Sequence, residues 1–146
     1  MTIKIAVENR NELRFVVYRY SGHISLADVL DSVTRAARQL TPNQPYRELL
    51  IFNHDTDLSD FDPETLATFY RQCDKLYREL KLGPRTAAAM LDESIDAKLI
   101  MPLFNVLSQA GGGADLSFEL FTEVEPALER LGVPLEEGLK IVARTI

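Results

Sequence analysis

The apolar run ELLIF, from Glu48 to Phe52, constrains the fold of this chain more than any other feature. After Glu48 it has four large apolar residues in a row, so neither face of a strand made from it is polar. Such a strand has to be covered on both faces, which is typical of a parallel sheet packed against helices. The run therefore predicts a central strand in an α/β fold.

A hairpin is expected ahead of this run. IKIAV (Ile3 to Val7) and LRFVVYRY (Leu13 to Tyr20) are rich in β-branched and aromatic residues, as strands are. The polar segment from Glu8 to Glu12 between them is typical of a turn. We expect the first strand to run antiparallel to the rest of the sheet.

Helices are expected wherever apolar residues recur three and four positions apart. The first begins after Ser25, a good N-cap residue, and the second after Asp62, a capping acid that precedes a proline. Two more are predicted, from Ala97 to Gln109 and from Val124 to Leu131. Gly132 is the expected C-cap of the last one.

RTAAAML (Arg85 to Leu91) and LSFELFT (Leu116 to Thr122) complete the set of expected strands. The order is then strand, strand, helix, strand, helix, strand, helix, strand, helix. This alternation predicts a single-domain α/β sandwich with a mixed, mostly parallel five-stranded sheet and about four helices. We assign residues 1–133 to the domain and residues 134–146 to a tail that packs on it or extends it.

The composition limits the choice of partner and compartment. The 146 residues carry a formal net charge of −6, and phosphate contacts need clustered Lys and Arg, so we expect no nucleic-acid partner. The single cysteine leaves no internal disulfide, which fits a reducing compartment and predicts a cytoplasmic protein. The first residues lack a signal-peptide pattern, and no apolar run approaches the roughly 20 residues that span a bilayer.

Five segments between Ile3 and Val133 occur in a familiar order: YSGHISLADV, ELLIFN, an Asp-rich loop into FDPETLATFY, GPRTAAAML and LSFELFTEVEPALERLG. They resemble the bacterial anti-sigma-factor-antagonist-like family, which is related to STAS domains and to lipid-binding CRAL-TRIO domains. The resemblance implies a STAS-like sandwich. It also implies a regulatory or ligand-binding module without enzymatic activity.

One motif of that family is missing. Anti-sigma-factor antagonists carry a phosphorylatable serine in an Asp-Ser-Ser/Thr-Gly motif before the second helix. This chain has Asp60-Phe61-Asp62-Pro63 there, so Phe61 stands in the place of the serine, and Ser59 does not occupy the matching position. We therefore expect no phosphorylation switch.

The loop from Asn53 to Asp62 is the best candidate for a functional site, because open α/β sheets bind ligands beyond the carboxyl ends of their strands. Its carboxylates could hold a hard cation. An EF-hand that starts at Asp55 would need a glycine in place of Asp60 and a glutamate in place of Leu66, so we expect no metal. We assign a ligand or partner loop to His54, Asp55, Asp57, Ser59, Asp60 and Phe61.

We expect no catalytic residue and no cofactor. Cys73 lies on the apolar stripe of the second helix, which predicts a buried, inert thiol. His23, at the end of the hairpin, has no partner that the sequence identifies. The glycines from Gly111 to Gly113 lack both the lysine of a P-loop and the spacing of a dinucleotide-binding motif.

A basic stripe is expected on the second helix, from Arg71, Lys75 and Arg78, with Lys81 and Arg85 beyond it. It could bind an acidic partner. The neighbouring acids Asp74 and Glu79 favour a solvated face instead.

The third helix is unusually apolar over Ala97 to Leu107 and contains Pro102, which should bend or restart it. Three interpretations remain open: a face for self-association, the wall of an apolar pocket, or a surface covered by the C-terminal tail. The residues assigned to this interface or pocket are Leu99, Ile100, Leu103, Phe104 and Leu107.

These observations predict a small cytoplasmic regulatory or protein-interaction module that is a homodimer and has a protein partner. The alternative is a carrier for a small apolar or lipid-like ligand, held between the third helix and the sheet. No enzyme is expected, because no nucleophile, base or cofactor loop is visible.

Overall fold

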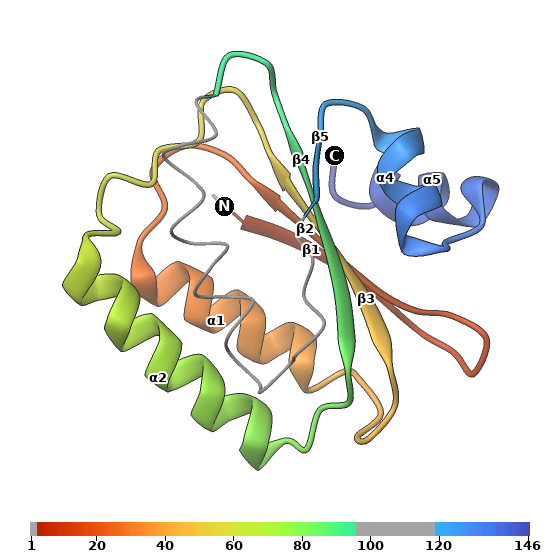
Figure 1. The fold of residues 1–146 in the computed structure, drawn as a ribbon, viewed down its shortest axis with the longest axis horizontal. Coiled ribbons are helices and arrows are strands. Elements are labelled where there is room, and N and C mark those ends of the chain that lie inside the picture. Colours follow the sequence, from red (N-terminus) through yellow and green to blue (C-terminus); the bar gives the residue numbers. More distant parts are fainter. Residues whose placement is uncertain (1–2, 96–118) are drawn as a thin grey trace.

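The computed structural model describes residues 3–95 and 119–146. Its centre is a five-stranded mixed sheet in the order β1-β2-β3-β4-β5, in which β1 is antiparallel to β2 and the other neighbours are parallel (Figure 1). The strands are β1 (Ile3–Asn9), β2 (Arg14–Tyr20), β3 (Tyr46–Phe52), β4 (Arg85–Leu91) and β5 (Glu119–Phe121). The predicted α/β class, the mixed sheet and the leading hairpin are confirmed.

In the described part of the chain, four helices lie on the two faces of this sheet. The helices α1 (Leu26–Ala37) and α2 (Pro63–Glu79) lie on one face, and α4 (Val124–Leu131) and α5 (Leu135–Ala143) lie on the other (Figure 1). The first two share a face because β2-α1-β3 and β3-α2-β4 are parallel connections that step in the same direction across the sheet, and such connections are right-handed. The helix predicted over Ala97 to Gln109 lies outside the described residues.

The sequence predicted two helix starts, after Ser25 and after Asp62, and one helix end, at Gly132. All three are confirmed. Ser25 and Asp28 form a capping box at the start of α1, and the Asp62 carboxylate accepts a hydrogen bond of 2.7 Å from the Thr65 amide. Gly132 ends α4 in the left-handed conformation, with φ of 70°. These caps depend on local hydrogen bonds, which is why the sequence alone located them.

The segment after Val133, which the sequence left as a tail of uncertain form, contains a helix. Gly138 of α5 lies directly on α4, where an added Cβ would come within 2.8 Å of a methyl group of Leu128. The glycine therefore permits close contact between the two helices.

Two cores result, one on each face of the sheet. Along β2, Val16, Tyr18 and Tyr20 belong to the core under α1 and α2, while Phe15 and Val17 belong to the core under α4 and α5. Residues Leu49 to Phe52 of β3 alternate between the two cores in the same way. Both faces of these strands are apolar for this reason.

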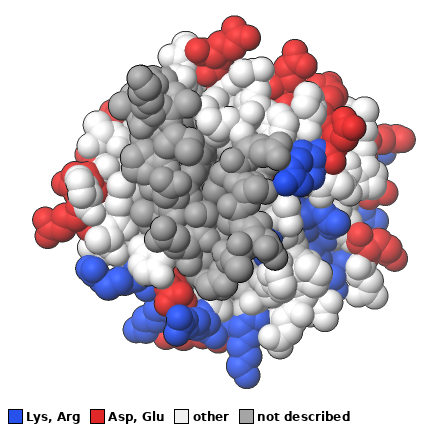
Figure 2. Space-filling model, in the orientation of Figure 1, with Lys and Arg blue, Asp and Glu red and all other residues white. Residues whose placement is uncertain are grey.

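Charge is distributed unevenly over the surface. On the face drawn in Figure 2, basic side chains gather at the lower edge, near the end of α2, and at the right, while acidic side chains lie along the upper, left and right edges. The carboxyl ends of the parallel strands point to the upper edge in the same orientation (Figure 1). The loop from Asn53 to Asp62 thus leaves the sheet on its acidic side.

Candidate functional site

The candidate site lies beyond the carboxyl ends of β2 and β3. The two strands are parallel neighbours, and Tyr20 pairs with Phe52 at the end of the register. The segments that follow them, 21–24 and 53–57, therefore leave the sheet side by side. This edge is where open α/β sheets place their ligands.

Backbone hydrogen bonds join these two segments. The Asp57 amide donates to the Gly22 carbonyl at 2.8 Å, and the Ile24 amide donates to the Asp57 carbonyl at 3.0 Å. The Thr56 hydroxyl also donates to the Tyr20 carbonyl at 3.0 Å. The Asp-rich loop is thus paired with the chain that leads into α1 and does not extend freely from the sheet.

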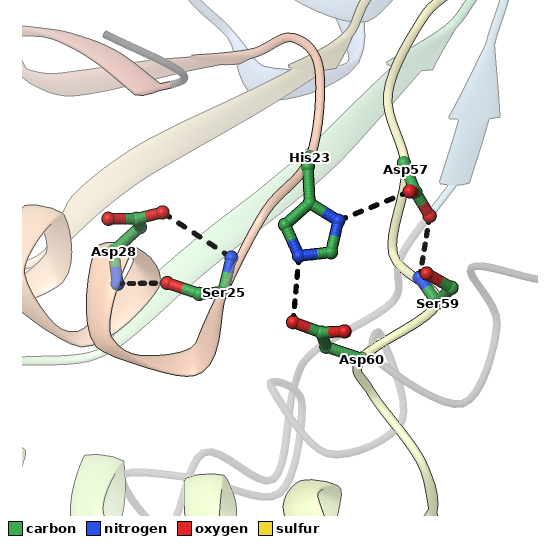
Figure 3. A network of polar contacts seen from close by, with 6 residues as sticks. All are labelled: His23, Ser25, Asp28, Asp57, Ser59 and Asp60. Atoms are coloured by element: carbon green, nitrogen blue, oxygen red, sulfur yellow. Dashed lines mark hydrogen bonds and ion pairs between the residues drawn. The ribbon is translucent and has the colours of Figure 1, made fainter.

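His23 connects the two segments through its side chain. Its Nδ1 lies 3.2 Å from Oδ2 of Asp57, and its Nε2 lies 2.8 Å from Oδ2 of Asp60 (Figure 3). We call these three residues the His23 cluster. Hydrogen bonds with the two carboxylates, chiefly that of Asp57 and next that of Asp60, raise the pKa of His23 above its ordinary value, because both carboxylates favour the imidazolium.

Asp57 is fixed from a second side. The Ser59 amide donates to its Oδ1 at 2.9 Å, which forms a turn typical of aspartate. Hydrogen bonds from Ser59, together with the contact with His23, lower the pKa of Asp57 to about 2. Asp57 is therefore a carboxylate near neutral pH, and it favours the charged form of His23.

This arrangement holds the loop in place and is poorly suited to acid–base chemistry. Both ring nitrogens of His23 face carboxylates, so neither is free to accept a proton from a substrate. Side chains about half exposed to water (55% for His23 and 50% for each aspartate) do not form the dry cavity that most catalytic groups occupy. Among the described residues, no group of three or more His, Cys, Asp or Glu could hold a metal ion.

The predicted loop residues divide into three groups. Asp57, Ser59 and Asp60 come together in and beside the His23 cluster, as described above. Phe61 turns inward and packs edge-on against Phe69, with 6.2 Å between ring centroids. His54 and Asp55 are exposed to solvent outside the cluster.

The main residue that sequence reasoning missed is His23, for which the sequence identified no partner. Its partners lie 34 and 37 positions further along the chain. The signal that could have found it is the parallel pairing of the two strands, since residues that follow neighbouring parallel strands meet at one edge. The interface or pocket residues Leu99, Ile100, Leu103, Phe104 and Leu107 lie outside the described residues.

Arg85 begins the strand β4, as predicted, but its contacts were not foreseen from the sequence. Its side chain is buried, 3.4 Å from Glu48 and 4.8 Å above the ring of Tyr77. Burial raises the pKa of Glu48, and the Arg85 charge opposes that change. On the exposed surface of α2, Arg78 pairs with Asp74 and Lys75 with Glu79, as a solvated face predicts.

Cys73 is buried in the core under α1 and α2, as predicted. Burial raises the pKa of its thiol to about 12, so the thiolate is scarce near neutral pH.

Comparisons with known proteins add no family assignment: no protein-family model matches the chain, and no curated protein sequence matches it significantly. None of the helices in the described part of the chain is long and apolar enough to cross a membrane.

Proposed function

We propose that this protein is a non-enzymatic regulatory module of the anti-sigma-factor-antagonist-like type, with a STAS-like fold, that binds a protein partner through the loop from Asn53 to Asp62. The observation that carries the proposal is the His23 cluster. It fixes an exposed acidic loop in one shape at the edge of the sheet where such folds bind their ligands. A surface ordered in advance loses little entropy on binding.

The chemistry of the surface indicates the charge of the partner. Asp55, Asp62 and Glu64 are exposed near the cluster in the chain, and His23 can carry at most one positive charge, which does not balance them. A partner that presents Lys or Arg would be attracted to this surface, and its association would weaken as salt is added.

Self-association is part of the proposal. The apolar sequence from Ala97 to Leu107 supports it, because obligate interfaces are as apolar as a domain core. The alternative, a carrier for an apolar ligand, gains no support from the pocket of about 390 Å³ beside α5. Five of its six lining side chains are charged.

The partner surface is tested by reversing charge without disturbing the His23 cluster. Asp55→Lys combined with Glu64→Lys changes one loop residue and one first-turn helix residue. Glu12→Lys combined with Glu125→Lys is the matched control, because it also changes one loop residue and one first-turn residue, remote from the loop.

Proteins retained from a lysate by the immobilised wild type, the variant and the control are compared by quantitative mass spectrometry. We expect one or a few proteins to be retained by the wild type and by the control and lost from the loop variant. Equal retention by all three would refute this surface as the partner site. Native mass spectrometry of the purified chain tests self-association, and a mass of 16.5 kDa without its double would refute the homodimer.

A further inference from the structure

A small pocket lies at Asn53, the first residue of the Asp-rich loop. Its volume is about 180 Å³, and it is lined by Lys4, Arg19, Ser21, Asn53, Thr145 and Ile146. It lies beyond the carboxyl ends of β2 and β3 on the face that carries α5, since Thr145 follows that helix. No acidic side chain lines it, although the chain as a whole has a net charge of −6.

The two cations of this pocket lie on neighbouring strands. Lys4 of β1 and Arg19 of β2 are directly opposite in the antiparallel register. Like charges opposite each other destabilise a strand pair. Among residues 3–95 and 119–146, no ion pair joins Lys4 or Arg19 to a carboxylate, either of a side chain or of the chain terminus.

The Arg19 guanidinium is held in position. Its Nε donates to the Thr145 hydroxyl at 3.0 Å, and its Nη1 donates to the side-chain oxygen of Asn53 at 3.2 Å. Thr145 is fully buried, which anchors the first of these bonds. Since a guanidinium has five N–H groups, these two bonds leave donors available to a ligand.

The environment of Arg19 also favours an incoming negative charge. The side chain is half-buried, and burial lowers the pKa of its guanidinium. A partly buried charge with no ionic partner is costly, and an anion would remove that cost.

We infer that this pocket binds the phosphoryl group of a small molecule, with Arg19 and Lys4 as its ionic partners and the hydroxyl and amide groups of Ser21 and Asn53 beside them. Two cations match the charge of a phosphate dianion, and Arg and Lys are the side chains that bind phosphate. The pocket is smaller than the 300–1,000 Å³ typical of sites for drug-sized ligands, so it holds the phosphoryl group while the rest of the molecule extends outward.

The larger pocket, between the hairpin and α5, does not share these properties. Its three cations already have ionic partners: Arg10 pairs with Glu8 and Glu137, Arg144 with Glu8, and Lys140 with Glu136. An anion there would have to displace existing ion pairs. In the smaller pocket, Lys4 and Arg19 form no ion pair with any described residue.

Isothermal titration calorimetry at pH 7.5 and constant ionic strength tests the assignment, with inorganic phosphate, phenyl phosphate and acetate as ligands. We expect saturable binding of a phosphate compound by the wild type and weaker binding or none of acetate. The two phosphate arms distinguish a site for free phosphate from one for a phosphate monoester.

Arg19→Gln should weaken phosphate binding by about tenfold or more, because it removes a charge-assisted contact. Lys4→Gln should weaken it several-fold, and it keeps the test valid if Arg19→Gln fails to fold, since Lys4 is exposed. Lys75→Gln, on the exposed surface of α2, is the matched control and should bind as the wild type does.

Three results would overturn the inference. They are no binding of either phosphate compound by the wild type, unchanged binding by folded Arg19→Gln and Lys4→Gln, and binding of acetate as tight as that of phosphate. Each concerns only this pocket, so none bears on the partner surface proposed above.

Discussion

At the scale of single residues, His23 determines how the acidic loop is held. Its imidazolium form makes two carboxylate contacts, to Asp57 and Asp60, and loses their ionic part when the ring loses its proton. Because the pKa of folded His23 is raised above the unfolded value near 6.5, its stabilising effect is fully present below that value. The effect is lost as the pH rises through the raised pKa.

We predict that replacing both aspartates, as Asp57→Asn with Asp60→Asn, returns the pKa of His23 toward 6.5. NMR titration of the His23 imidazole in the wild type and in the double variant measures this change. A His23 pKa in the wild type equal to that in the double variant would contradict the ionic contacts described here.

At the scale of secondary-structure elements, the sequence predicted best what local hydrogen bonds decide. The caps of α1 and α2 and the glycine after α4 were found because Ser25, Asp62 and Gly132 act on their own neighbours. The helix α5 was missed because it has no side-chain cap and contains a glycine in its interior. Its stability comes from packing, which no local pattern encodes.

The same distinction between local and long-range contacts explains which residues of the site could be predicted from the sequence. The aspartates of the loop were recognised from their own positions, whereas His23 joins them only through the parallel pairing of β2 and β3. Arg85 was placed correctly in a strand, but its contact with Glu48 on the neighbouring strand was not predicted, because the position of a residue along the chain gives no information about that contact. Contacts between strands depend on the register of the sheet.

The contact between α4 and α5 can be tested at Gly138. We predict that Gly138→Val destabilises the protein by about 1–3 kcal/mol, because the added side chain would overlap fully buried Leu128. Gly138→Ala should cost less, since the gain of up to about 1 kcal/mol in helix propensity opposes a smaller overlap. Urea unfolding measures both, and Glu136→Ala on the exposed surface of α5 is the control.

A double-mutant cycle identifies the cause. If overlap with Leu128 is responsible, the cost of Gly138→Val should fall when Leu128 is also changed to Ala, because the two positions are in contact. Additive costs would mean that Gly138 is needed for another reason.

At the scale of the whole molecule, the sheet connects two cores that the chain builds with separate helices. The side chains of the central strands point alternately into the two cores. If the helices over one core unfold, the apolar side chains on that face of the same strands become exposed to water. The helices α4 and α5 are therefore not expected to unfold independently of α1 and α2. The absence of tryptophan is convenient here, because Tyr18, Tyr20, Tyr46 and Tyr77 all report on the core under α1 and α2.

We predict that Phe69→Ala, in that core, and Leu128→Ala, in the opposite core, each lower the free energy of unfolding by about 2–5 kcal/mol. For each variant, the midpoint urea concentration should fall by the same amount whether unfolding is followed by tyrosine fluorescence or by far-ultraviolet circular dichroism. This is expected because the domain unfolds in a single step. Glu125→Ala, which is exposed on α4, is the control. If Leu128→Ala moved only the circular dichroism transition and left the tyrosine signal unchanged, α4 and α5 would form a separately unfolding unit. The central strands would then not couple the two cores.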